Sequence, residues 1–202
     1  MEFLVAVILI SALVMSGLRR IKLLNNAFAV QSLFIAVLCL TKGFESGEYH
    51  YYILFLLTFI IKVLGIPFII NKSVKYLKMN REMELIINGF WSYMFTGFSM
   101  VIIFIVLKGY GDFIFKTGIA LMIAGSMLLI GRKKAITQMI GLLTLENGIV
   151  LFEVVMVKMG WIIELGIIFE LLVLALIMGM MVFRINKTFD TVNTDYLTSL
   201  KE

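Results

Sequence analysis

The sequence contains very few residues that bind transition metals. Its 202 residues include one cysteine, Cys39, and one histidine, His50. A single cysteine cannot form an internal disulfide, and these two side chains are too few for a zinc or iron–sulfur site. We therefore expect this chain to bind no metal or redox cofactor, so that any redox chemistry belongs to other chains.

Charged residues are also scarce. They make up 15% of the sequence, against about 25% in soluble domains, whereas 61% of the residues are apolar. The net charge of +5 is not arranged as a continuous basic face that water can reach, so nucleic-acid binding is excluded and contact with anionic lipid is favoured. P-loop, dinucleotide-binding, HExxH and GxSxG motifs are lacking. These features predict an integral membrane protein without an active site of its own.

Seven apolar runs approach the length needed to cross a membrane as helices, which is about 20 residues for a hydrocarbon layer of ~30 Å. They are 2–18, 25–41, 51–71, 90–107, 113–131, 135–157 and 161–183. We therefore expect an all-α protein in which residues 1–202 form a single transmembrane domain of seven helices, with a short cytoplasmic tail at 184–202. The first two runs are the shortest.

The basic residues are divided unequally between alternate gaps. The gaps after the first, third and fifth runs, together with the tail, contain thirteen of the 18 Lys and Arg residues, whereas the other gaps contain four. Loops rich in Lys and Arg remain in the cytoplasm. This pattern predicts an N-terminus outside and a C-terminus in the cytoplasm.

Several ionisable residues lie inside the apolar runs, where an unpaired charge costs roughly 2.5–3.5 kcal/mol. Lys62, Glu146 and Glu170 lie within two residues of the centres of the third, sixth and seventh runs. We expect these three at one depth near the middle of the membrane. Glu153 follows Glu146 by seven residues, so it shares a helix face about 10 Å away. Glu164 lies nearer the outer surface.

These residues predict a proton relay. Burial favours the protonated form of a carboxyl group and a nearby ammonium favours its ionised form, so a change in their separation moves the proton. The candidate relay residues are Lys62, Glu146, Glu170 and Glu153, with Glu164 as a possible outer member and Asn147 and Gln138 as polar supports. Two alternatives are open: a static ion pair that only fixes helix packing and, for Glu164, a side chain that reaches interfacial water.

Two further patterns concern helix geometry. Pro67 follows Lys62 by five residues and removes an intrahelical hydrogen bond near residue 63, which predicts a bend. The small residues Gly118, Ala124 and Gly125 in the fifth run are typical of close helix packing.

The last two runs resemble a known family. The segments GRKKAITQMIGLLTLENGIVLFE and WIIELGIIFELLVLALIMGMMVFRINK resemble the last two helices of the small three-helix K-type subunit of respiratory complex I, within a unit at 112–184. In that pattern the last-helix Glu matches Glu170. The family's other Glu corresponds to Leu143 here, and the nearest acid is Glu146. The whole chain, with GLLTLENGIVLFE and a Lys followed by IP at 62–67, resembles the hydrogenase-4 component E family.

This resemblance implies a subunit of a hydrogenase- or formate-hydrogenlyase-type complex in the inner (plasma) membrane of a bacterium or archaeon. The partners would be antiporter-like membrane subunits, a membrane anchor subunit and a cytoplasmic hydrogenase arm. That arm, rather than this chain, would hold the nickel–iron centre and iron–sulfur clusters. This chain would contribute carboxylates to lateral proton transfer. A subunit of a multisubunit cation/proton antiporter and an assembly subunit whose buried charges only pair are the alternatives.

Overall fold

The computed structural model describes residues 1–76, 86, 88–156 and 166, and the regular structure in these ranges is helical, without β-strands. The elements are α1 (Glu2–Gly17), α2 (Ile21–Ser46), α3 (Tyr49–Leu57), η1 (Thr58–Gly65), α4 (Ile66–Tyr76), α5 (Gly89–Val106), α6 (Phe113–Gly131) and α7 (Ala135–Met156). The predicted seventh helix at 161–183 and the tail at 184–202 lie outside the described residues, apart from Gly166.

Five helices in the described ranges are long and apolar enough to cross a membrane. They are Ile21–Ser46, Tyr49–Lys72, Gly89–Val106, Phe113–Gly131 and Ala135–Met156, whereas Glu2–Gly17 is shorter. The prediction of a helical, membrane-spanning protein is therefore confirmed at this level.

The helix bounds follow the apolar runs, but the helices of the second and third runs are longer than predicted. α6 has the predicted bounds, and α1 and α5 differ from prediction by one residue at one or both ends. α7 begins at the predicted Ala135 and continues to Met156, the last described residue of this segment. The predicted bounds of 25–41 for α2 were too short, because this helix begins at Ile21 and continues through a polar last turn to Ser46. There Lys42 Nζ lies 2.8 Å from Glu45 Oε2, and Gly47, with a φ of 70°, ends the helix.

The third predicted run is one continuous helix whose winding changes in the middle. It is α-helical in α3, π-helical in η1 and α-helical again in α4, and it extends to Tyr76 rather than ending at 71. The N–H of Ile66 donates to the carbonyl of Ile61, five residues back. The next residue, Pro67, has no N–H to donate. The change of winding therefore lies where the proline predicts a disturbance, and Lys62 lies within it.

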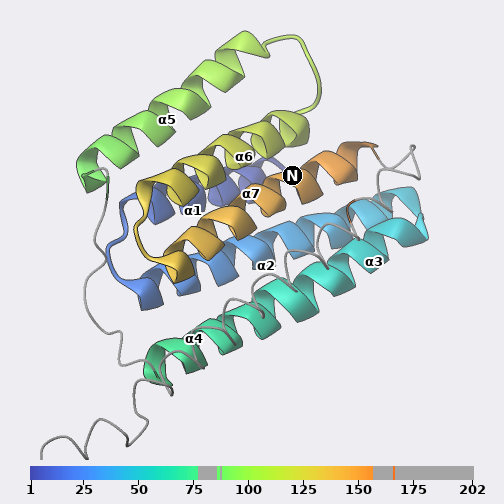
Figure 1. Cartoon of the computed structure of the whole chain (residues 1–202). Helices are drawn as coiled ribbons and strands as arrows, with labels where there is room; N and C mark the ends of the chain where they lie inside the picture. The colour runs from blue at the N-terminus through green and yellow to red at the C-terminus, as the bar shows by residue number, and fades with distance from the viewer. Residues whose placement is uncertain (77–85, 87, 157–165, 167–202) are drawn as a thin grey trace, which may run out of the picture.

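The helices pack in two groups, and α2 contacts both α1 and α7 where the groups meet (Figure 1). α2 lies beside the rod formed by α3, η1 and α4, while α6 lies along α7, and α5 packs on α6 and α1. Glycines allow the backbones of α6 and α7 to approach closely. A Cβ atom built on Gly148 would lie 2.6 Å from the carbonyl oxygen of Gly118, and one on Gly125 would overlap the backbone of Leu145. The close packing predicted from Gly118 and Gly125 is therefore present.

The turn between α6 and α7 is attached to the end of α1 by Arg132, whose side chain is buried. Its Nη1 donates to the carbonyl of Leu18 at 2.7 Å, and its Nη2 donates to those of Met15 at 3.0 Å and Ser16 at 3.1 Å. These carbonyls form the negative end of the α1 dipole. Burial lowers the pKa of Arg132 to about 10, so the side chain stays charged at neutral pH.

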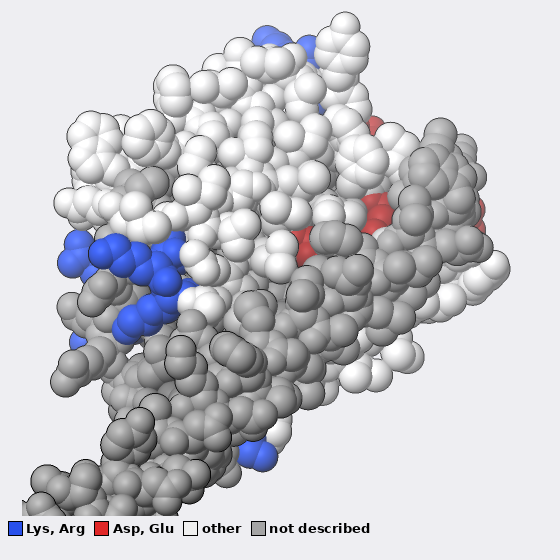
Figure 2. Space-filling model, in the orientation of Figure 1, with Lys and Arg blue, Asp and Glu red and all other residues white. Residues whose placement is uncertain are grey.

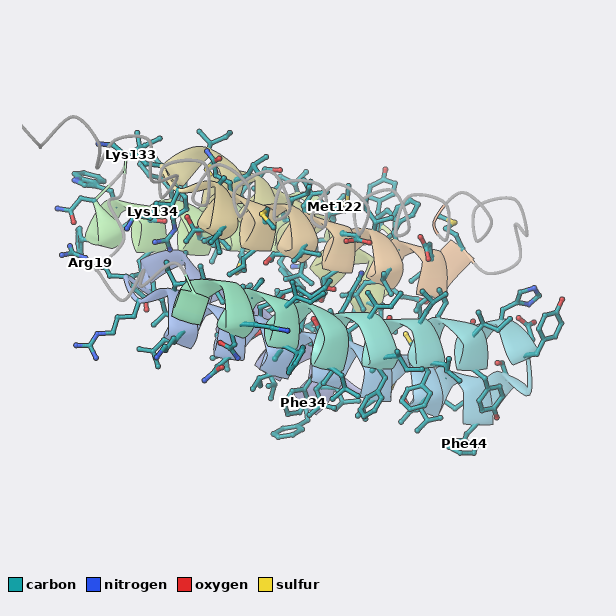
Figure 3. The ribbon with its side chains drawn as sticks, turned by 60° about the horizontal axis from the view of Figure 1, so that its bottom comes forward. Arg19, Phe34, Phe44, Met122, Lys133 and Lys134 are labelled. Carbon is teal, nitrogen blue, oxygen red and sulfur yellow. The ribbon has the colours of Figure 1, made fainter. Side chains whose placement is uncertain are left out.

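Figure 2 shows a cluster of basic side chains at one end of the bundle, with a few others elsewhere on this face. Figure 3 shows Arg19, Lys133 and Lys134 at this end and Phe44 towards the other. Arg19 Nη2 also donates to Asn88 Oδ1 at 3.3 Å, which brings the start of α5 to the same end. The turns after α1 and α6 and the start of α5 therefore lie at the same end of the described bundle, in agreement with helices that alternate in direction.

Candidate functional site

Lys62 and Glu146 form a buried ion pair between η1 and α7. Lys62 Nζ lies 3.5 Å from Glu146 Oε1, and the two side chains are 0% and 3% exposed. A charge-assisted hydrogen bond usually measures about 2.7–2.9 Å. The pair is therefore held mainly by charge attraction, and a small helix movement would change its geometry. The sequence predicts these residues at one depth, and the structure brings them into contact.

The helix that carries Lys62 supplies a second buried polar group. Thr58, one turn before Lys62, is 1% exposed, and its Oγ1 makes no hydrogen bond within the described part of the chain. π-Helical segments are rare and are often found at functional sites. This segment therefore places one cation and one hydroxyl inside the bundle.

Asn147, next to Glu146, connects α7 to α2. Its Nδ2 donates to Gln31 Oε1 at 3.2 Å and to Ser32 Oγ at 3.1 Å. Gln31 Nε2 in turn donates to the carbonyl of Ile8 in α1 at 3.4 Å. All three polar side chains are fully buried. We call Lys62, Glu146, Asn147, Gln31 and Ser32 the polar layer, because their contacts join η1, α7, α2 and α1.

Glu153 is a second buried carboxylate on α7, and its residue is 3% exposed. Gly166, from the segment after α7, lies against it: a Cβ on Gly166 would overlap the Glu153 carboxylate. Glu153 and Glu146 are two turns apart, about 10 Å along the helix axis. Direct proton transfer needs heavy atoms within about 3.2 Å, or one bridging water. A relay between these carboxylates therefore requires another proton carrier.

The remaining predicted site residues are not part of the polar layer as described. Gln138 lies near the start of α7, where its Nε2 donates to the carbonyl of Arg132 at 2.8 Å and stabilises the turn. Glu164 and Glu170 lie outside the described residues, so their predicted roles stay predictions. In the described ranges, no group of three or more His, Cys, Asp or Glu side chains could hold a metal ion.

Sequence reasoning missed Gln31 and Ser32, which lie in the middle of the second apolar run. The signal was available, since two adjacent polar residues interrupt that run. It was weak because uncharged polar side chains are far less costly in a membrane than charges.

Comparisons with protein-family models, curated proteins and solved structures gave no match.

Proposed function

We propose that this chain is a membrane subunit of a multisubunit, redox-driven, ion-translocating complex of the hydrogenase type, and that its buried carboxylates take part in lateral proton transfer. The observation that carries the proposal is the buried pair of Lys62 and Glu146. Burial favours the protonated form of the Glu146 carboxyl group, whereas the nearby Lys62 ammonium favours the carboxylate, so a change in their separation would move a proton onto or off Glu146.

Two features favour a relay over a pair that serves only packing. First, the cation is carried by a π-helical segment, η1, next to a proline, and small changes of winding there would alter its distance from Glu146. Second, α7 carries another buried carboxylate, Glu153. Glu170, predicted at the depth of Glu146 on the next helix, would be the further carrier that a relay from Glu146 to Glu153 requires.

The proposed topology has seven helices, with the N-terminus outside and the C-terminus in the cytoplasm of the inner membrane of a bacterium or archaeon. It is supported by the basic residues gathered at one end of the bundle (Figures 2 and 3). The redox part of the proposal rests on the family resemblance of the sequence. The same resemblance implies that the partners are antiporter-like subunits, an anchor subunit and a hydrogenase arm.

An assembly subunit is the second candidate, and one observation favours it. The polar layer joins four helical elements through one ion pair and three hydrogen bonds. In the low-dielectric interior of a membrane protein, such contacts can serve packing alone.

Purification of the intact complex through a tag on this chain tests the proposed function. The proposal predicts that nickel, iron and labile sulfide co-purify with the complex. A complex that contains antiporter-like subunits but none of these elements would instead identify a cation/proton antiporter. The chain purified alone serves as the control and should contain no stoichiometric metal, because it has one cysteine and one histidine.

A further inference from the structure

Three consecutive residues of α7 contact three different neighbours. Glu146 pairs with Lys62 of η1, and Asn147 donates to two side chains of α2. A Cβ on Gly148 would meet Gly118 and Met122 of α6. Successive residues of an α-helix point about 100° apart, so these contacts fix the rotation of α7 about its own axis.

The ion pair alone cannot fix this rotation. Its 3.5 Å separation is compatible with some range of carboxylate positions. The close contact of Gly148 with Gly118 brings α6 and α7 together, but it lies on a different face of α7 from Glu146. The directional contacts are the two hydrogen bonds from Asn147 to Gln31 and Ser32. These bonds lie in a fully buried environment, where no water competes for the same donors.

We propose that Gln31 and Ser32 are positioning residues for Glu146: by accepting both hydrogen bonds from the Asn147 amide, they hold the adjacent carboxylate against Lys62. The Gln31 amide extends this support to α1 through the carbonyl of Ile8. The proposal deepens the proposed relay and rests on it for its functional consequence, although the geometric effect can be measured independently.

Among the residues that the structure describes, the charged groups nearest to Glu146 are Lys62 and Glu153. From η1 the facing charge is Lys62, and on α7 itself Glu153 lies two turns away. The charged residues of α1, α2 and α6 lie near helix ends, at Glu2, Lys22, Lys42, Glu45 and Lys116. Glu164 and Glu170 are outside the described residues. The protonation of Glu146 should therefore be sensitive to its distance from Lys62.

The test uses the double variant Gln31→Leu, Ser32→Ala in the intact complex. These changes remove both acceptors of the Asn147 amide and keep the side chains close to their original size. Thr144→Val is the matched control. Thr144 is buried on the same helix, but its hydroxyl donates to the carbonyl of Ile140 within α7, at 2.8 Å, and so joins no other helix.

The readout is the infrared band of the protonated Glu146 carboxyl group, recorded against pH and identified by its loss in Glu146→Gln. If the carboxylate moves away from Lys62, the band should persist to higher pH than in the wild type, by about one pH unit or more. Thr144→Val should leave the band unchanged. An unshifted band in the assembled double variant, or an equal shift in the control, would overturn the proposal.

Two further outcomes are decisive. If the double variant does not assemble, the milder Ser32→Ala variant decides: a smaller shift in the same direction supports the proposal, and an unshifted band overturns it. If the band shifts in the double variant while Glu146→Gln leaves proton-coupled turnover intact, the positioning role stands and the proposed relay fails.

Discussion

Asn25 of α2 donates a hydrogen bond from Nδ2 to the carbonyl oxygen of Pro67 in α4, at 3.1 Å, and its side chain is fully buried. This contact lies just past the π-helical segment that carries Lys62. It attaches the first turn of α4 to α2. When the winding of η1 changes, the end of η1 that adjoins α4 therefore stays in place. The position of Lys62 thus depends on Pro67, which ends the π-helical hydrogen-bonding pattern, and on Asn25, which fixes α4.

Replacement of Pro67 by alanine should disturb the ion pair. The new N–H allows ordinary α-helical bonding, and a return of η1 from π- to α-helical winding would rotate Lys62 relative to Glu146. We expect the complex to assemble and its proton-coupled turnover to fall about tenfold. Such a loss corresponds to an increase of roughly 1.4 kcal/mol in the activation free energy. Turnover of the complex in proteoliposomes measures the effect.

Phe68→Ala is the control for Pro67→Ala. Phe68 is the next residue, its side chain is 68% exposed, and its loss should leave turnover close to the wild-type value. Equal turnover in Pro67→Ala and wild type would show that the winding of η1 does not govern the pair.

The contact between α6 and α7 should tolerate no side chain at Gly148. A methyl group there would lie 2.6 Å from the carbonyl oxygen of Gly118 and 2.7 Å from Met122 Cγ. We expect Gly148→Ala to lower the free energy of unfolding in detergent by about 1–3 kcal/mol. Gly131→Ala, where a Cβ meets nothing within 4 Å, should lower it little. Similar stability for the two variants would contradict the close packing.

Cysteine labelling tests the proposed topology, in a Cys39→Ala background. Lys133 lies at the basic end of the bundle (Figure 3), and the proposal predicts that Lys133→Cys in intact cells reacts only with a membrane-permeant reagent. Tyr110, between α5 and α6, is 73% exposed and lies at the other end, so Tyr110→Cys should react with an impermeant reagent. The reversed pattern would place the N-terminus inside.

The helices of the described part could be predicted from the sequence because the cost of burying polar groups in a membrane determines where an apolar run must end. The second and third runs were the exceptions, since their helices are longer than predicted. A helix does not have to stop where its apolar run stops, and α2 continues in polar surroundings through an ion pair of Lys42 and Glu45. Apolar length therefore gives the part of a helix that lies in lipid rather than the whole helix.

The depth of the candidate site in the membrane could be predicted from the sequence, but the helices that face each other there could not. Counting residues placed Lys62 and Glu146 at one level, because the helical rise is constant. Which helices face each other depends on packing around the whole bundle, so the contact of Asn147 with Gln31 and Ser32 could not be foreseen. Gln138 illustrates the same limit, since it lies on the same helix as Glu146 but caps a turn instead.

Paired substitutions at Lys62 and Glu146 test the central claim most directly. Glu146→Gln keeps the size of the side chain but removes its exchangeable charge, and Lys62→Met removes the ammonium. Assembly of the complex and its proton-coupled turnover in proteoliposomes are measured for both variants and for the double variant. Glu45→Gln, at the exposed end of α2, is the control and should match the wild type.

A relay predicts that Glu146→Gln and Lys62→Met each assemble normally and lose most proton-coupled turnover, and that the double variant stays inactive. A pair that serves only packing predicts the reverse: each single change leaves a buried partner uncompensated and lowers assembly, and the double change restores assembly and turnover. Full proton-coupled turnover in a normally assembled Glu146→Gln complex would contradict the account.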